Sequence, residues 1–383
     1  MISKNELQAD IVELFLKQKQ GYFIGAGGLG KTTTAIKCIK ALPDNLLVHI
    51  IVPRISLKLQ WEEELVKWEV KNAIVYVINT YTMSTSMISD FLIIDECHLA
   101  INELAKVFNK CLHASTFTYF LGLTATLNEE HATTFHTKNI FCIKEVTFKE
   151  ALLNKWVSPV QEYNRFLDFT PEEQKLYDKA NESCEKYFNF FHRNFNDVMN
   201  ALSNPDFRKE YARKRNLEEA IIGRNAVNFN RFLKARKDLI FNAENKVIQT
   251  VDICNHYNEK TIIFSESTKF VDIVHSKLAN SLPYHSNLND KDKKNNLELF
   301  LKDRIQILVA CKAADQGVNK PSASLGIIAS GTSNPNTQMQ RIFRFSRYVE
   351  SKQSRVFNLV MKNSQELSWL KARQKNSDRP III

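Results

Sequence analysis

The chain has 383 residues, 25% of them charged and 44% hydrophobic, so it is long enough for two folded domains and too apolar for intrinsic disorder. Its formal net charge of +10 favours a polyanionic partner, with nucleic acid as the first candidate. No apolar run reaches the ~18 residues of a membrane span, and the N-terminal stretch lacks a signal-peptide apolar block. The seven cysteines are scattered without a C-x-x-C pair, which argues against a disulfide framework or a zinc site and for a reducing, cytoplasmic environment.

The first strong motif follows an amphipathic helical stretch at residues 4–19. Residues 22–24 predict a buried strand, residues 33–42 predict a helix, and GAGGLGKT lies between them. That sequence fits G-x-x-x-x-G-K-S/T, the phosphate-binding loop, in the strand–loop–helix context that the motif requires. Glycines let backbone N–H groups converge on an anion, and the helix start adds a positive dipole end. We expect a nucleotide to bind at Gly25, Ala26, Gly27, Gly28, Leu29, Gly30, Lys31, Thr32 and Thr33.

A pair of carboxylates forms the second constellation. The apolar run FLII at residues 91–94 predicts a buried strand that ends at Asp95 and Glu96. Downstream of a phosphate loop, Asp95 can hold the Mg²⁺ that Thr32 also ligates, while Lys31 reaches the β- and γ-phosphates. Glu96 can then orient the attacking water and accept its proton. The sequence therefore predicts a site for ATP and Mg²⁺.

Further strands surround these motifs. Apolar runs predict strands at residues 46–52, 73–78, 118–121 and 140–143, alternating with helices. Such alternation predicts a parallel sheet whose functional residues lie at the carboxyl ends of its strands. A second α/β pattern predicts strands at 261–264, 305–310, 323–329 and 355–360, with helices at 269–278, 337–348 and 365–374.

Between the two patterns lies a region that we expect to be helical, from Pro171 to about Tyr257. It interleaves aromatic residues with basic clusters, including Arg213, Lys214 and Arg215. Basic and aromatic side chains together can follow a phosphate backbone and stack on bases. A helical hairpin with buried aromatics and solvated charges explains the same pattern, and both interpretations stay open.

The ordered set of segments resembles the superfamily-two helicases and translocases. GAGGLGKT resembles motif I, IIVPRISLKLQW motif Ia, DECH motif II, LTATL motif III, TIIFSES motif IV, ILVACKAADQGVNKP motif V and TQMQRIFRFSR motif VI. The branch with the most similar pattern includes excision-repair and phage branch-migration helicases. The resemblance implies two RecA-like parallel-sheet lobes, at residues 1–150 and 151–383, with the helical insertion at about 171–257.

The resemblance also implies roles for individual residues. Lys31, Thr32, Asp95 and Glu96 would hold and hydrolyse MgATP, Gln8 would recognise adenine, and Arg344 and Arg347 would reach the γ-phosphate from the second lobe. His98, Thr124 and Thr126 would couple hydrolysis to movement, and Asp315, Gln316 and Gly317 would lie near the ribose and the strand. The nucleic-acid track would comprise Arg54, Thr80, Ser265, His285, Cys311 and Lys312. Two positions depart from the family pattern: Phe343 replaces the usual glycine, and Cys311 replaces a frequent threonine.

We therefore expect an ATP-hydrolysing nucleic-acid helicase or translocase, with DNA favoured over RNA and no membrane association. The alternatives are a duplex-DNA translocase that does not separate strands, an RNA helicase and a nucleotide-switched nucleic-acid-binding protein. The presence of Glu96, Arg344 and Arg347 argues against the switch, because a switch needs no full catalytic set.

Overall fold

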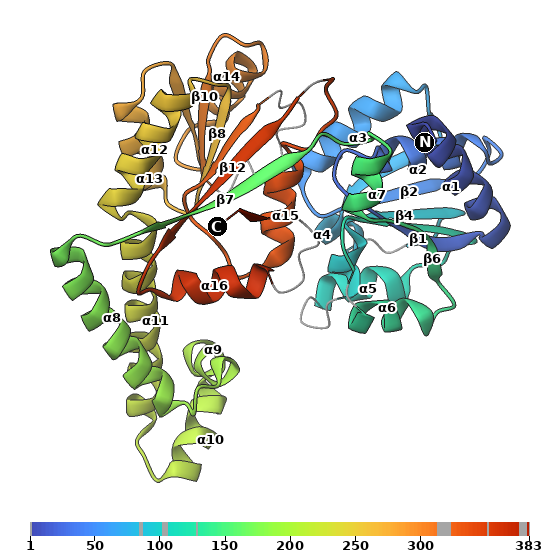
Figure 1. The fold of residues 1–383 in the computed structure, drawn as a ribbon. Helices are drawn as coiled ribbons and strands as arrows, with labels where there is room; N and C mark the ends of the chain where they lie inside the picture. Colours follow the sequence, from blue (N-terminus) through green and yellow to red (C-terminus); the bar gives the residue numbers. More distant parts are fainter. Residues whose placement is uncertain are drawn as a thin grey trace.

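The computed structural model describes residues 2–83, 87–101, 106–127, 129–311, 323–350, 352–374 and 381–382. It has two sheet-containing lobes, and a helical arm extends away from the second of them (Figure 1). Every pairing between the described strands is parallel. The prediction of two parallel-sheet lobes with a helical insertion is confirmed.

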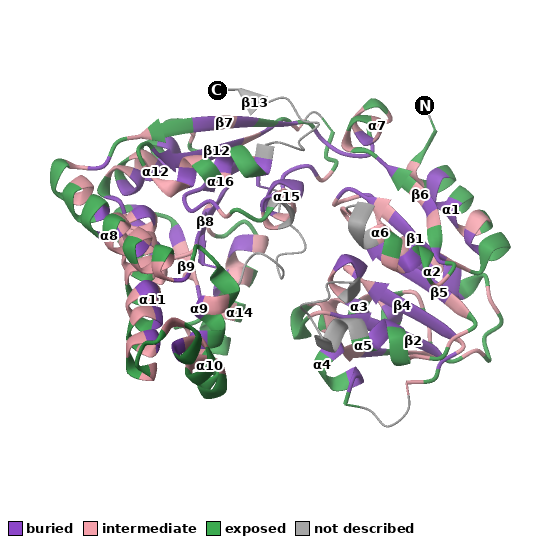
Figure 2. Ribbon diagram, turned by 90° about the horizontal axis from the view of Figure 1, so that it is seen from below, coloured by how far each residue is buried: buried purple, intermediate pink, exposed green. Residues whose placement is uncertain are grey.

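The first lobe is built on a six-stranded sheet with the order β3-β2-β4-β5-β1-β6. The four central strands, β2, β4, β5 and β1, are mostly buried, as expected for a parallel sheet covered on both faces (Figure 2), whereas the edge strands β3 and β6 are partly exposed. The strands are β1 (Gln20–Gly25), β2 (Val48–Val52), β3 (Ala73–Val77), β4 (Phe91–Asp95), β5 (Tyr119–Thr124) and β6 (Phe141–Val146). Strands β1 and β4 flank β5 at the centre, so the phosphate loop and the carboxylate pair leave the sheet at the same edge.

Helices cover both faces of this sheet. One face packs against α1 (Lys4–Gln18), α2 (Lys31–Lys40), α3 (Ile55–Lys67) and α7 (Phe148–Leu153). The other face packs against α4 (Ile78–Tyr81), α5 (Lys106–Ala114) and α6 (Glu129–His136), and the 3₁₀ turn η1 (Cys97–Ile101) follows β4. Helix α1 starts with a capping box in which Ser3 and Glu6 satisfy each other's backbone N–H groups, and this fixes the entry to the lobe.

The second lobe has a seven-stranded sheet with the order β13-β7-β12-β11-β8-β10-β9. Its strands are β7 (Val160–Leu167), β8 (Thr261–Ser265), β9 (Ser281–Tyr284), β10 (Ile307–Cys311), β11 (Leu325–Ile328), β12 (Ser354–Met361) and β13 (Ile381–Ile382). Helices α12 (Glu244–Tyr257) and α13 (Thr268–Lys277) pack on one face, and α14 (Asp290–Leu301) and α15 (Pro335–Phe343) on the other. Helix α16 (Gln365–Gln374) follows β12.

The helical insertion leaves the second lobe between β7 and α12. It consists of α8 (Pro171–Phe190), α9 (Phe195–Ser203), α10 (Pro205–Arg215) and α11 (Glu219–Phe241). It has its own small core, in which Phe188 stacks on Phe229 at a centroid distance of 5.0 Å. The predicted helical region thus divides into an arm, α8–α11, and a lobe helix, α12, because Val247 and Ile253 pack into the second sheet's core.

No described helix is long and apolar enough to cross a membrane. All seven cysteines are free thiols.

Candidate ATP and nucleic-acid site

The phosphate loop lies between β1 and α2, as predicted. Gly28 and Gly30 have φ values of 91° and 82°, the left-handed region in which glycine has no steric penalty. The ammonium of Lys31 donates to the carbonyl of Gly25 over 2.9 Å, so the side chain folds back across the loop. The first turn of α2 continues from the loop, with the Thr34 N–H donating to the carbonyl of Gly30. A concave loop, a lysine and a helix N-terminus therefore converge on one point.

Two side chains of α1 reach the same loop. Gln8 is buried, accepts a hydrogen bond from the Lys37 ammonium over 2.8 Å, and lies so close to Gly30 that a β-carbon there would come within 2.6 Å of its Nε2. Lys4 donates to the carbonyl of Gly28. Burial lowers the pKa of Lys4, and the positive charge of Arg347 lowers it further. Lys4 has no sequence motif to mark it, and sequence reasoning missed it.

Asp95 and Glu96 stand at the carboxyl end of β4. The indole N–H of Trp61 on α3 donates to Asp95 Oδ2 over 2.9 Å, and the backbone N–H of Glu96 donates to Oδ1 over 3.0 Å. Burial raises the pKa of both carboxyl groups, and the charge of Lys31 opposes this shift. Glu96 also has a φ of 54°, a left-handed conformation that is uncommon for a residue with a β-carbon and is concentrated at functional sites.

A polar chain connects Glu96 to the end of β5. His98 Nδ1 lies 3.4 Å from Glu96 Oε2 and 3.0 Å from the hydroxyl of Thr124. The Thr124 hydroxyl in turn donates to the carbonyl of Thr126 over 2.8 Å. The three residues that the resemblance assigns to coupling thus form a chain of contacts, from Glu96 through His98 and Thr124 to Thr126.

The second lobe closes over this site. A cavity of about 160 Å³ lies between the lobes, and its lining includes Lys31, Glu96, Gln340, Arg344 and Arg347. Burial lowers the pKa of Arg347, whose Cγ lies 3.6 Å from the position of a β-carbon on Gly28. Both arginines named from the sequence therefore border the same cavity as the phosphate-loop lysine and the carboxylate.

The segment that carries these arginines differs from its prediction. The pattern predicted a helix at residues 337–348, but α15 ends at Phe343, so that boundary is wrong and Arg344 and Arg347 lie beyond the helix. Beyond the helix, Arg347 forms an antiparallel bridge with Val157, and the Ser158 N–H donates to the carbonyl of Ser346 over 2.7 Å. These pairings with the segment before β7 take up backbone groups that a longer helix would need.

Phe343, the departure from the family pattern, is an interlobe contact. Its ring is buried, belongs to the core of the first lobe and lies 5.8 Å from that of Phe148. A β-carbon on Gly27 would come within 2.5 Å of the Phe343 β-carbon. Glycine at position 27 therefore serves the close approach of the second lobe as well as the curvature of the phosphate loop.

A wider hollow of about 730 Å³ continues from the phosphate loop toward α1 and the linker after α7. Its lining includes Lys4, Gly30, Thr32, Trp156 and Tyr348. It is large enough for the remainder of a nucleotide, with Arg347 and Tyr348 contributed by the second lobe.

Thr32 and Asp95 carry the oxygen atoms that Mg²⁺ prefers as ligands. This ion takes oxygen ligands and is commonly held by one or two carboxylates together with substrate phosphates, so it needs no all-protein cage. Thr32, in the first turn of α2, lines the hollow of about 730 Å³, and Asp95 ends the strand β4. Among the described residues, no group of three His, Cys, Asp or Glu side chains offers a separate metal site.

The residues assigned to the nucleic-acid track fall into two groups. Arg54, before α3, and Thr80, on α4, are exposed. Ser265, His285 and Cys311 are buried. The Ser265 hydroxyl lies 3.3 Å from that of Ser330, and His285 Nε2 lies 3.0 Å from the Asp272 carboxylate, so both side chains have intramolecular partners. Lys312, Asp315, Gln316 and Gly317 lie outside the described residues.

Two family models and two sequence relatives show which known proteins the chain resembles. Residues 243–349 match the model of the helicase conserved C-terminal domain, and residues 2–89 match that of the type III restriction enzyme res subunit. The chain is 24% identical over 398 residues to the DNA 3'-5' translocase XPB2 of Sulfurisphaera tokodaii, a match that covers 98% of this chain and 85% of that protein. A shorter match, 30% identical over 129 residues, joins 31% of this chain to 12% of the DNA repair protein RAD5 of Candida albicans.

A comparison of structures gives the same fold. The crystal structure of the Pyrococcus furiosus Hef helicase domain aligns with a TM-score of 0.55 at 14% identity, over 97% of each chain. The structural neighbour shows the same fold, and the ordered motifs, the two family models and the DNA translocase relative support a superfamily-two helicase related to the excision-repair type.

Proposed function

We propose that the protein is an ATP-driven translocase on DNA that separates strands as it moves. The interlobe cavity carries this proposal, because Lys31 and Glu96 of the first lobe border it together with Arg344 and Arg347 of the second. An active site completed only when two lobes meet links each hydrolysis cycle to a lobe movement.

Within that site, each residue has a proposed task. The loop N–H groups and Lys31 bind the β- and γ-phosphates, and Thr32 with Asp95 holds Mg²⁺, which neutralises charge on the phosphates when bound. Glu96 orients the attacking water and accepts its proton. Arg344 and Arg347 stabilise the charge that develops on the γ-phosphoryl group. Gln8, already in contact with the loop, recognises the adenine base.

DNA is the proposed polymer because the long relative is named a DNA translocase and the chain carries a net charge of +10. In this proposal the strand crosses the first lobe at Arg54 and Thr80, and the exposure of both side chains supports it. A duplex translocase without strand separation stays a second candidate, since that relative is named for translocation.

The test is the ATPase rate without polymer and with single-stranded DNA, duplex DNA and RNA, followed by unwinding of a forked duplex. We expect stimulation by DNA above RNA, unwinding of the fork, and loss of all hydrolysis in Lys31→Ala with DNA binding retained. A protein that displaces the third strand of a DNA triplex but does not unwind the fork would instead be a duplex translocase. Equal rates with and without every polymer would overturn the proposal.

A further inference from the structure

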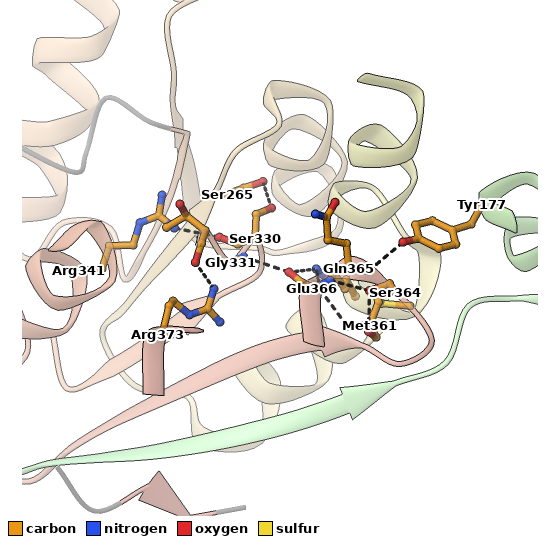
Figure 3. A network of polar contacts seen from close by, with 12 residues as sticks. Tyr177, Ser265, Ser330, Gly331, Arg341, Met361, Ser364, Gln365, Glu366 and Arg373 are labelled. Atoms are coloured by element: carbon orange, nitrogen blue, oxygen red, sulfur yellow. Dashed lines mark hydrogen bonds and ion pairs between the residues drawn. The ribbon is translucent and has the colours of Figure 1, made fainter. Parts of the chain in front are cut away.

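The turn at residues 330–332 connects β11 to the segment that enters α15. Each of its residues is held by a charged side chain (Figure 3). The Ser330 carbonyl accepts from Arg341 Nη1 over 2.9 Å, the Gly331 N–H donates to Glu366 over 3.1 Å, and the Thr332 carbonyl accepts from Arg373 Nη1 over 2.6 Å. A β-carbon on Gly331 would come within 2.3 Å of Arg373 Nη1, so a larger residue there would displace this guanidinium.

Glu366, in the first turn of α16, is the centre of this arrangement. Its carboxylate is fully buried and accepts from the Lys246 ammonium over 2.9 and 2.8 Å, from the Gly331 N–H, and from the Met361 N–H over 2.9 Å. It therefore joins α12, the turn and the end of β12. Burial lowers the pKa of Lys246, while the Glu366 charge opposes that shift.

The same helix start is tied to the helical insertion. The backbone N–H of Gln365 donates to the hydroxyl of Tyr177 on α8 over 2.8 Å. Lys246 lies on α12, the helix that follows the last insertion helix. The first helix of the arm, α8, and the helix that follows the arm, α12, thus both contact the start of α16, at Gln365 and Glu366.

On its other side, the turn holds α15. Arg341 is fully buried, and besides the Ser330 carbonyl it contacts Glu266, with Nη2 2.5 Å from Oε1. Three residues later the chain reaches Arg344, whose backbone N–H donates to the Arg341 carbonyl over 3.3 Å. A displacement of the turn would therefore move Arg341 and the arginine segment that borders the ATP cavity.

Stability alone does not account for the Lys246–Glu366 pair. Replacing a buried ion pair by apolar residues of similar volume is often neutral or stabilising, because both charges lose their hydration. The pair differs from an apolar contact in fixing the direction of two backbone N–H groups, those of Gly331 and Met361. A role in positioning fits these contacts better than a role in stability.

We propose that Glu366, paired with Lys246, is a positioning residue for ATP hydrolysis that holds the 330–332 turn and, through Arg341, orients Arg344 and Arg347. The inference rests on the proposed ATPase function. In Glu366→Gln one oxygen becomes an N–H₂ donor facing other donors, so the turn loses its alignment while the side chain keeps its volume.

The test measures single-turnover ATP hydrolysis with saturating DNA and binding of a fluorescent ATP analogue. We expect Glu366→Gln to lower the hydrolysis rate at least tenfold and to change the dissociation constant less than twofold. Lys246→Met/Glu366→Met, which removes both charges and so restores folding should the single change impair it, is expected to show the same loss. Ile253→Ala, a buried apolar change on α12, is the control and should lower the melting temperature while leaving the rate within twofold.

A double-mutant cycle with Arg344→Ala decides whether Glu366 acts through the arginine segment. Glu366→Gln should cause little further loss in the Arg344→Ala background. An equal factor in both backgrounds, or a wild-type rate in Glu366→Gln, would overturn this inference while leaving the proposed function intact. A wild-type protein without DNA-stimulated hydrolysis would overturn the proposed function, and the inference with it.

Discussion

Glu96 combines a left-handed backbone with a raised carboxyl pKa, at the point where β4 meets the ATP cavity. Glu96→Gln preserves the shape of the side chain and removes the base. We expect ATP binding to persist and hydrolysis to fall by ~10²–10⁴, the usual contribution of a positioned general base. Single-turnover hydrolysis and equilibrium ATP binding measure the two effects, with exposed Glu63→Gln on α3 as the matched control. A wild-type rate in Glu96→Gln would remove this carboxylate from catalysis.

Lys352 has a buried ammonium for which the described residues offer no hydrogen-bond acceptor. Burial, reinforced by the charge of Arg347, lowers its pKa to about 8 from 10.5. Between those values the unfolded chain binds more protons than the folded one, so the contribution of Lys352 to stability increases with pH from about 8 to 10.5 and is unfavourable below 8.

Lys352→Met should therefore raise the melting temperature of the nucleotide-free protein at pH 7, and this advantage should shrink as the pH rises toward 10. Thermal unfolding of both proteins across that range measures the difference. Lys277→Met, at an exposed position on α13, should show no such trend. A constant difference at every pH would contradict the assignment.

At the scale of the element, α10 shows why a basic cluster is not one functional unit. Arg213 and Lys214 are exposed, whereas Arg215 donates to the Phe190 carbonyl over 2.5 Å and stacks on the Phe190 ring at 4.6 Å. Arg215 therefore stabilises the arm from within. The other two face solvent, where a phosphate backbone could reach them, with Lys214 in a surface ion pair with Glu210 at 2.6 Å.

We expect Arg213→Gln/Lys214→Gln to flatten the dependence of log affinity on log salt, by up to ~0.9 for each duplex-DNA phosphate that the variant no longer neutralises. Arg215→Gln should instead lower the melting temperature and leave the slope unchanged. Fluorescence anisotropy across a salt series, with circular dichroism melts, separates the two. An unchanged slope in a folded double variant would indicate that these charges are only solvated.

Phe343, the last residue of α15, contributes to the contact between the lobes as well as to the stability of its helix. Because the ring packs against Phe148 and over Gly27, Phe343→Gly opens a space between the lobes as well as introducing a poor helix former. Truncation of a buried phenylalanine costs ~3–5 kcal/mol, and here that cost falls on the closed arrangement. We expect weaker ATP-dependent closure, measured by fluorescence transfer between dyes on the lobes, whereas Phe343→Leu should retain most of it. Closure unaffected by Phe343→Gly would show that this contact is dispensable.

For the whole molecule, the decisive property is that one cavity takes residues from both lobes. Arg344→Ala is expected to reduce hydrolysis by ~10³–10⁵ while ATP affinity changes far less, as for an arginine finger. Single-turnover hydrolysis with saturating DNA tests this, with Arg347→Ala alongside and exposed Lys277→Ala as the control. Hydrolysis at the wild-type rate in both arginine variants would mean that the second lobe does not complete the site.

Local pattern was sufficient for the strands of the first lobe and for locating the single motifs, but not for β13 or for the end of α15. Alternating apolar strands and helices determine a parallel sheet, because strands buried on both faces need continuous apolar runs. A glycine-rich loop between a strand and a helix predicts a phosphate site in the same way, since its geometry is local. The carboxylate pair at the end of β4 is likewise a local feature, because it directly follows an apolar strand.

Only the tertiary structure decided what depends on contacts between distant segments. Lys4 reaches Gly28 and Trp61 reaches Asp95 across large sequence separations that carry no motif. The end of α15 is set by pairing with Val157, nearly two hundred residues earlier, so helix propensity could not locate it. Burial of Ser265 and His285, and the joining of Lys246 to Glu366, likewise follow from packing. The sequence by itself determined which chemical groups the protein presents, whereas folding decided which of them face one another, because side-chain proximity is a property of the whole packed chain.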